Sequence, residues 1–165
     1  MGINWKVKKN QFPEMERTVA ELSGRRVNVG AHGEQAWLAG IHEYGCKIEV
    51  TEKMRAYLHC QGLHLKADTK YITIPERAFL RNGYDLNKIV VVDNVDPALG
   101  TVLDGSMEVD KFLEMVGLVL SSTIKDYARD LDTPPNHPFT IERKGSSSPL
   151  VATGDMIESI SYEVE

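Results

Sequence analysis

An apolar stripe between residues 106 and 131 constrains the fold of this chain more than any other feature of the sequence. Its members recur at helical spacing over about six turns: Val109, Phe112, Leu113, Val116, Leu120, Ile124, Tyr127 and Leu131. This periodicity predicts one long amphipathic helix whose apolar face packs against a large neighbouring element. We expect Ser106 to cap the helix, and Glu108 and Asp110 to suit the positive end of its dipole.

Shorter patterns around this helix predict a mixed set of strands and helices. Alternation of apolar and polar residues predicts strands at 3–8, 25–30 and 159–165, and a hairpin at 63–74. Helical spacing predicts helices at 13–23, 34–45 and 51–61, and a further helix that opens at Pro75 and Glu76. The expected fold class is therefore α+β: a small mixed or antiparallel sheet packed against one long amphipathic helix, with extended loops and arms.

The segment between residues 87 and 105 supports two interpretations. The run IVVVD (89–93) favours a strand by propensity, whereas its place between two helical patterns favours a continuing helix. Pro97 would break a single helix that crossed it, although Asp96-Pro97 suits the start of a new helix. The sequence leaves the structure of this segment open.

The chain has 165 residues, and without an internal repeat or a long linker we expect a single domain over 1–165. Within it, 1–30 is expected to form strand, helix and strand, and 46–74 to form a helix and a hairpin that are mobile until assembly. Prolines are expected to keep 133–154 extended, as a strap that leads into the C-terminal strand of 133–165. In this strap Gly145 is expected to supply a bend, and Thr153 to cap a short helix.

The net charge of −5 argues against a general nucleic-acid binder, which needs a basic face. No stretch approaches the roughly 18 apolar residues of a membrane span, so we expect no membrane partner. The N-terminus has no long apolar run after its basic residues, and we expect no signal peptide. With two cysteines in a chain expected in a reducing cytoplasm, free thiols are favoured over a disulfide.

A group of histidines and cysteines between residues 42 and 64 is the candidate metal site: His42, Cys46, His59, Cys60 and His64. Zinc is often bound by pairs at spacings of this kind, and His42/Cys46 and Cys60/His64 are each four residues apart. Each pair straddles a glycine that is expected to end a helix, and neither matches a zinc-finger spacing. We therefore favour half-buried cysteines and solvent-facing histidines, with no bound metal.

The sequence offers no catalytic group that we can assign. Ser146–Ser148 lie in a polar stretch without the Gly-x-Ser-x-Gly elbow of hydrolases. Lys144 precedes Gly145, whereas a phosphate-binding P-loop has the glycine before the lysine. We expect neither a catalytic residue nor a cofactor, and we expect the chain not to be an enzyme.

Four phrases, taken in order, resemble a family of phage virion-morphogenesis proteins, the tail-completion or head–tail joining proteins of long-tailed phages and prophages. The phrases are IHEYG (41–45), ITIPERAFLR (72–81), TPPNHPFTIERKGSSSPLVATGDM (133–156) and SISYEVE (159–165). The resemblance covers about residues 27–165. The motif residues that it singles out are His42, Glu43, Tyr44, Gly45, Pro75, Arg77, Phe79, Leu80, Arg81, Thr133, Pro134, Pro135, Lys144, Gly145, Ser146, Pro149, Leu150, Thr153 and Gly154. Ala78 stands where the family often has proline, so we expect this turn to be more helical here.

The resemblance implies a non-enzymatic virion protein that completes the tail and joins it to the head connector. Such a protein forms a ring, expected to be a hexamer, around a channel through which DNA passes without specific binding. Its implied partners are other copies of itself, the tail tube or tail terminator, and the head connector or stopper. The implied location is the head–tail junction of the virion, after synthesis in the bacterial host cytoplasm.

Two alternatives remain open. The chain could be another ring component of the same particle, namely a tail terminator, a head-side stopper or a minor tail protein. It could also be a small zinc-binding protein or hydrolase that uses the histidines and cysteines of 42–64.

Overall fold

A computed structural model of the chain describes residues 11–165. The strand expected at 3–8 lies outside the described residues. The elements in chain order are α1 (Phe12–Ser23), β1 (Val27–Ala31), α2 (Gln35–Tyr44), β2 (Cys46–Glu49), α3 (Glu52–Cys60), β3 (Tyr71–Ile74), α4 (Phe79–Leu103), α5 (Val109–Asp130), α6 (Pro138–Lys144), α7 (Asp155–Glu158) and β4 (Ile160–Val164). Helices and short antiparallel strands together confirm the α+β class.

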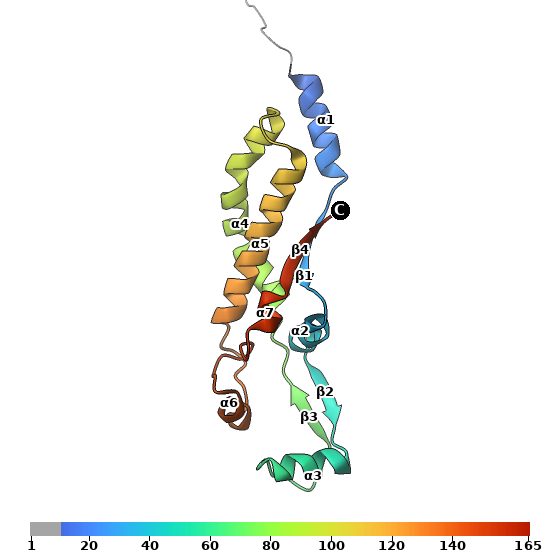
Figure 1. Cartoon of the computed structure of the whole chain (residues 1–165), viewed down its shortest axis with the longest axis vertical. Helices are drawn as coiled ribbons and strands as arrows, with labels where there is room; N and C mark the ends of the chain where they lie inside the picture. Colours follow the sequence, from blue (N-terminus) through green and yellow to red (C-terminus); the bar gives the residue numbers. More distant parts are fainter. Residues whose placement is uncertain (1–10) are drawn as a thin grey trace, which may run out of the picture.

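The described chain is elongated (Figure 1). Helices α4 and α5 lie side by side, and the ribbon formed by β1 and β4 packs along α5. Helix α1 extends one end of the molecule, while β2, β3 and α3 extend the other. We call residues 46–74, which comprise β2, α3 and β3, the arm, and the other described residues the body.

The stripe of α5 forms much of the body's core, as its periodicity predicts. Its most buried members are Val109, Phe112, Leu113, Ile124 and Leu131. They join two clusters, one with Phe79 and Ile160 and one with Val102 at the end of α4. The predicted N-cap was wrong, because Glu108 occupies the cap position and the Ser106 backbone N–H instead bonds to Asp104 Oδ1 at 2.9 Å.

The β1–β4 ribbon returns the C-terminus to the N-terminal part of the body. Val27 pairs with Val164 at one end of the ribbon, and Ala31 pairs with Ile160 at the other. A Cβ atom at Gly117 of α5 would lie 2.3 Å from a carbon of the Tyr162 ring. The ribbon can therefore lie this close to α5 only because residue 117 has no side chain.

Helix α4 runs without interruption through the segment that the sequence left open. The expectation that Pro97 breaks a helix crossing it was wrong, since Pro97 lies inside α4. A proline inside a helix costs about 3 kcal/mol. Val95, Ala98 and Val102 on both sides of it pack into the cluster with Phe112, and this burial outweighs the local cost.

The arm differs from the predicted hairpin of 63–74. Strand β3 pairs with β2, so that Cys46 lies opposite Ile74 and Glu49 lies opposite Tyr71. Residues 63–70 form a loop instead, because the Arg55 guanidinium binds the carbonyl oxygens of Lys66 at 2.8 Å and Thr69 at 2.7 Å. The helix predicted before this loop is confirmed, and Thr51 Oγ1 caps it by accepting from the Met54 N–H at 3.2 Å.

The predicted strap of 133–154 is extended only in part, since α6 occupies its middle. Pro138 stands in the first turn of α6, where its missing N–H costs nothing, and His137 Nδ1 accepts from the Phe139 N–H at 3.2 Å. Gly145 ends the helix with φ of 70°, which confirms the bend expected there. The short helix expected after Thr153 is present as α7, but Gly154 and not Thr153 occupies its cap position. The Thr153 hydroxyl accepts from the Asp155 N–H at 3.4 Å.

Candidate functional site

The candidate site is the junction where the arm leaves the body. The end of α2, the segment that leads into α4 and the proline stretch after α5 meet there, although they lie far apart in the sequence. The Arg77 N–H donates to the His42 carbonyl at 2.8 Å, and the Ala78 N–H donates to the Glu43 carbonyl at 3.2 Å. Gly45 then turns the chain into β2 with φ of 68°, in a space where a Cβ atom would lie 2.7 Å from the Glu76 nitrogen.

Glu43 is the buried carboxylate of this junction, with 2% of its surface exposed. Its oxygens accept from the Leu80 N–H at 2.8 Å, the Arg81 N–H at 3.2 Å and the Arg81 Nε–H at 2.8 Å. Glu43 therefore caps the first turn of α4, where Ala78 at the cap position has no side chain that could do so. A negative charge at this end of α4 also complements its dipole.

Ala78 adopts a left-handed backbone, with φ of 36° and ψ of 41°. The expectation that a helix opens at Pro75 and Glu76 was wrong, because α4 begins at Phe79. The expectation that alanine makes this turn more helical was wrong too. The left-handed turn directs the N–H groups of residues 80 and 81 at the Glu43 carboxylate. A left-handed non-glycine residue costs about 1–2 kcal/mol, which the charged hydrogen bonds of Glu43 offset.

Arg81 connects the junction to the surface. Besides Glu43, its guanidinium binds Glu76 Oε1 at 2.6 Å and lies over the Tyr44 ring, 5.1 Å from the centroid. These hydrogen bonds, with Glu43 first, raise the pKa of Arg81 above its usual range. Arg81 thus holds α2, the 75–78 segment and α4 together.

Arg77 is buried, with 4% of its surface exposed, and binds neutral acceptors. It donates to the Pro134 carbonyl at 3.0 Å, to Asn136 Oδ1 at 3.0 Å and to the Pro135 carbonyl at 3.5 Å. His42 Nδ1 lies 3.2 Å from its Nη1. Burial lowers the pKa of Arg77 from its usual range. The guanidinium therefore fastens the strap to the body of its own chain.

His42 shares this cationic surrounding. Burial, and then the charges of Arg77 and Lys144, lower its pKa from 6.5 to about 4. A neutral imidazole at neutral pH can accept the Arg77 hydrogen bond. Burial and Arg77 also lower the pKa of Lys144, whose ammonium donates to the carbonyls of Ser148 and Pro149.

A cavity of about 260 Å³ lies beside this group. Its lining combines apolar side chains with a few polar ones: Gln35, Leu38, His42, Asn136, Thr140, Lys144, Pro149, Leu150, Ala152, Thr153, Gly154 and Met156. No serine or cysteine is among the described residues that line this cavity. The serines of the 146–148 stretch therefore do not face His42 across the cavity.

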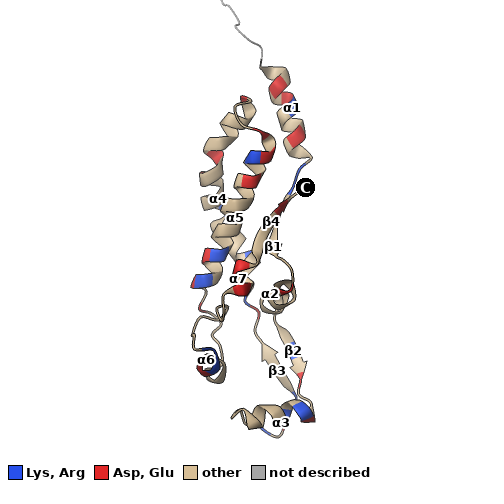
Figure 2. Cartoon of the chain, in the orientation of Figure 1, with Lys and Arg blue, Asp and Glu red and all other residues tan. Residues whose placement is uncertain are grey.

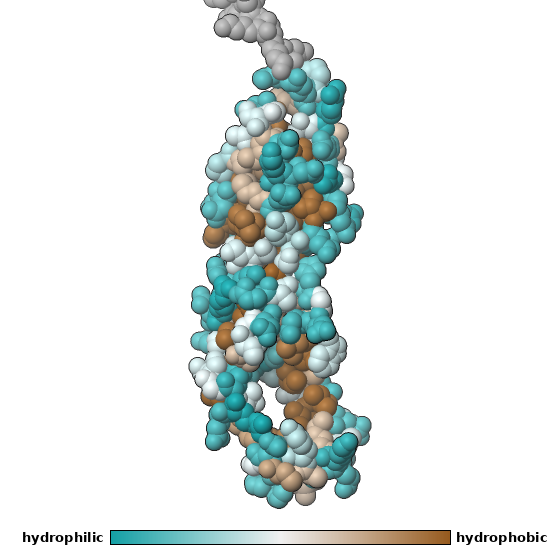
Figure 3. All heavy atoms as spheres, in the orientation of Figure 1, coloured by the Kyte–Doolittle hydropathy of each residue, from teal (hydrophilic) through white to brown (hydrophobic). Residues whose placement is uncertain are grey.

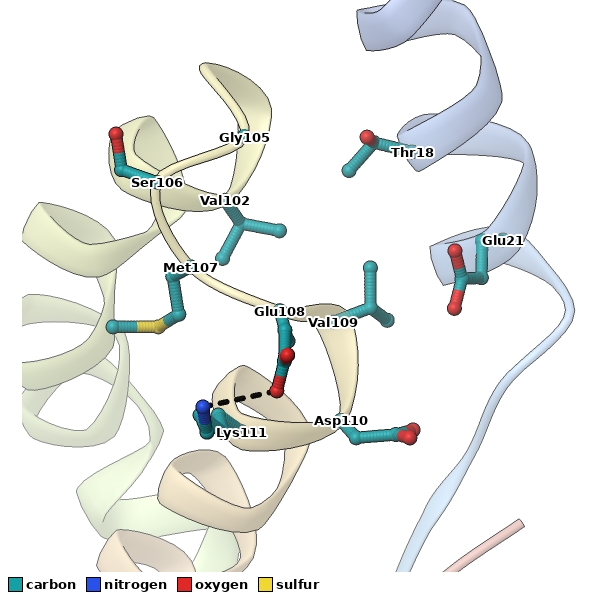
Figure 4. A pocket seen from close by; sticks show the side chains of 10 residues that line it. All are labelled: Thr18, Glu21, Val102, Gly105, Ser106, Met107, Glu108, Val109, Asp110 and Lys111. Atoms are coloured by element: carbon teal, nitrogen blue, oxygen red, sulfur yellow. Dashed lines mark ion pairs between the residues drawn. The ribbon is translucent and has the colours of Figure 1, made fainter.

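A larger hollow of about 710 Å³ lies between α1 and the start of α5 (Figure 4). Thr18 and Glu21 of α1 face the 105–109 turn across it, and Glu108 on its floor pairs with Lys111 at 2.9 Å. Neither a histidine nor a cysteine is among the residues that line the hollow. Helix α1, none of whose residues is fully buried, lies over it as a partly detached element.

The structure does not bring the metal candidates together as a site. His59 and His64 lie side by side with their Nδ1 atoms 2.7 Å apart, next to exposed Cys60. His42 lies instead among the cations of the junction, and Cys46 is on β2. Within residues 11–165 no group of three or more histidine, cysteine, aspartate or glutamate side chains is placed to hold a metal ion.

Figure 3 shows several hydrophobic patches, coloured brown, on one face of the molecule. Two groups of exposed apolar residues lie outside the junction. The first, which we call the α4 outer face, consists of Leu86, Ile89 and Val90, with 71%, 70% and 51% of their surfaces exposed. The second is on the arm, where Tyr57 of α3 and Tyr71 of β3 are exposed. Ile48 is also exposed, but it pairs with Ile72 and therefore lies on the opposite face of the β2–β3 ribbon from Tyr71. Trp37 and Tyr44 of α2 are exposed as well.

Some of the motif residues therefore belong to one hydrogen-bond network, and others lie outside it. The network contains His42, Glu43, Arg77, Leu80, Arg81, Pro134, Pro135, Lys144 and Pro149. Ser146 has no role in it. Asn136 and Glu76, which no motif reasoning selected as site residues, belong to it through Arg77 and Arg81. Their positions inside the quoted phrases were the signal that could have identified them.

Comparison of the chain with protein-family models, with curated proteins and with solved structures gave no match. Among the described residues, no helix combines the length and the apolar character that crossing a membrane would require.

Proposed function

We propose that this chain is a non-enzymatic structural protein of a phage or prophage particle, which completes the tail and joins it to the head connector. In this proposal several copies, six by the family resemblance, form a ring around the channel through which DNA passes. The partners are neighbouring copies, the tail tube or terminator on one side, and the connector or stopper on the other.

The observation that carries the proposal is the amount of surface that a single copy leaves exposed. The chain exposes 11637 Å², whereas a compact monomer of 18.5 kDa exposes roughly 8,200 Å². A fully solvated decapeptide in place of residues 1–10 would account for roughly 1,700 Å² of the difference. The remaining excess of roughly 1,700 Å² exceeds the roughly 800 Å² that each partner contributes to one standard interface. A protein with this surface suits a role as one part of an assembly.

The junction supports the same proposal. Three of the four phrases that carry the family resemblance meet there, through Glu43, Arg77 and the carbonyls of Pro134 and Pro135. Their charges bind one another and backbone groups, as they do in a structural joint. Such a joint would hold the arm at a fixed angle to the body, which a ring subunit needs in order to meet its neighbours.

The distribution of charge is compatible with a DNA channel. Acidic and basic residues alternate over the body without a continuous basic stripe (Figure 2), and the net charge is −5. Tight binding of DNA requires clustered lysine and arginine side chains. Since these are not clustered here, DNA moving through the channel would make few phosphate contacts with the protein.

The test is to inactivate the gene in the phage or prophage that encodes it and to examine the particles by negative-stain electron microscopy. We expect filled heads beside separate tails of normal length, and a plasmid copy of the gene restores joined particles. Tails of excessive length would identify a tail terminator instead. Normal infectious particles would refute a structural role.

A further inference from the structure

The outer side of α4 carries apolar side chains that stay exposed in the monomer. Along this 25-residue helix, Gly83, Val91 and Val102 face inward and are buried. Leu86 and Ile89 face outward and are about 70% exposed. A helix with apolar residues on all sides is typical of an element that is buried all round. The α4 outer face therefore requires a partner surface that the monomer does not provide.

The arm is the complementary uncovered element. None of its residues is buried, and α3 packs no side chain into a core. A two-stranded ribbon such as β2–β3 is marginal in water without further packing. Its exposed Tyr57 and Tyr71 are of the kind that interfaces favour, because tyrosine contributes a large apolar area with a polar tip.

The charges of the two surfaces are opposite in sign. Residues 46–74 contain five lysines and arginines and three acidic residues, which gives a net charge of +2. The whole chain has a net charge of −5, so the residues outside the arm together carry −7. Around the α4 outer face, residues 85–96 contain three aspartates and one lysine. Opposite charge speeds and orients association between the two surfaces.

The two surfaces cannot meet within one molecule. The arm projects from the end of the body opposite to α1, beyond the junction, while the α4 outer face lies along the body (Figure 1). A contact between them therefore needs two copies. Since each copy offers one surface of each kind, the contact is heterologous, and repetition of it closes into a ring if the rotation allows.

We propose that the arm of one copy packs on the α4 outer face of the next copy, with Tyr57 and Tyr71 of the arm against Leu86, Ile89 and Val90. This inference rests on the ring assembly of the proposed function and assigns its subunit contact. Each copy then uses two patches of roughly 800 Å² each, and the excess of roughly 1,700 Å² accommodates both.

Site-directed cysteine cross-linking tests the contact on the full chain, in a background in which Cys46 and Cys60 are both changed to serine. Tyr57→Cys and Ile89→Cys are made on separate chains, which are tested alone and mixed under mild oxidation. We expect dimers linking the two different chains in the mixture and little product from either variant alone. Protein concentrations up to about 1 mM capture even a contact with a Kd of that order.

Three outcomes would overturn the proposal. Efficient linkage of Ile89→Cys with itself would show that the α4 outer faces pair symmetrically. Linkage of Ile89→Cys with a Val7→Cys chain, in preference to Tyr57→Cys, would assign this face to the N-terminal segment. Absence of any linkage between copies would mean that another protein covers it.

A second measurement uses charge in place of cross-linking. Sedimentation of the full chain over a concentration series is compared for Ile89→Asp, Tyr57→Asp and the control Val19→Asp, which changes an exposed apolar residue of α1. We expect both interface variants to weaken self-association at least about tenfold and the control to leave it unchanged. Equal association of all three would contradict the proposal. The particle experiment is independent, since cross-links can form in a protein whose loss leaves particles intact.

Discussion

The body and the arm of this chain differ in what holds them together. In the body, α4, α5 and the β1–β4 ribbon enclose two apolar clusters, one with fully buried Phe79 and Ile160 and one with fully buried Val102. In the arm, strand pairing and the Arg55 hydrogen bonds to loop carbonyls hold the fold, and no side chain is buried. The body therefore has the packed interior of a stable monomer, whereas the apolar side chains of the arm are at most partly buried within the described chain.

The first test of this contrast concerns Phe79, which has no exposed surface and opens α4 directly beside the junction. Phe79→Ala removes a large side chain from the first core cluster. We expect the free energy of unfolding to fall by about 3–5 kcal/mol, as measured by urea denaturation followed by far-UV circular dichroism. A loss below about 1 kcal/mol would mean that the body lacks the packed interior described above.

Glu43 tests whether the joint between body and arm depends on its buried charge. Glu43→Gln places an amide group against the N–H donors of Leu80 and Arg81, and the charged hydrogen bonds are lost. We expect a loss of about 2–3 kcal/mol in the free energy of unfolding. The matched control is Glu76→Gln, because Glu76 binds the same arginine at the surface and should cost less than about 1 kcal/mol. Equal losses for both variants would contradict the special role of Glu43.

The helix α5 illustrates what could be predicted from the sequence. Its apolar stripe depends only on residues close in the sequence, repeats over many turns and marks the side that is buried. The helix and most of its buried residues could therefore be identified. The strand β4 and the cap at Thr51 have equally local signals. Strand β2 of the arm gave no such signal, because the alternation in its four residues is too short and its pairing with β3 is non-local.

Several residues of the candidate site could be predicted from the sequence, but their arrangement in space could not. The family resemblance selected Glu43, Arg77 and Arg81, but the burial of Glu43 and its capping of α4 depend on the left-handed turn at Ala78, for which alanine gives no indication. The continuity of α4 through Pro97 likewise depends on packing against α5. In both places tertiary contacts outweigh a local preference, and a single sequence does not show them.

The imidazole of His42 makes the joint sensitive to pH. Its folded pKa of about 4 lies below the ordinary value of 6.5, so between these values the unfolded chain binds more protons than the folded chain. The stabilising contribution is complete above pH 6.5 and is lost as the pH falls through 4. The full shift corresponds to about 3 kcal/mol, which the partial exposure of the ring reduces to about 1–2 kcal/mol.

Comparison with His42→Gln isolates this contribution, since glutamine can still accept from Arg77 but does not titrate. Between pH 7 and pH 4.5 we expect the free energy of unfolding to fall by about 1 kcal/mol more for the wild-type chain than for the variant. Urea denaturation at both pH values provides the measurement. Parallel losses in the two proteins would mean that His42 is protonated as readily when folded as when unfolded.

Tyr71 on β3 provides the smallest expected effect and the closest counterpart to Phe79. Its ring is 56% exposed, and replacement by serine removes no buried contact within the monomer. We expect the free energy of unfolding of the monomer to change by no more than about 0.5 kcal/mol, although the same substitution should weaken association between copies. Denaturation at low protein concentration and sedimentation at high concentration separate the two effects. A loss of stability comparable with that of Phe79→Ala would show that the arm belongs to the same core as the body, and it would remove the reason for an intermolecular partner.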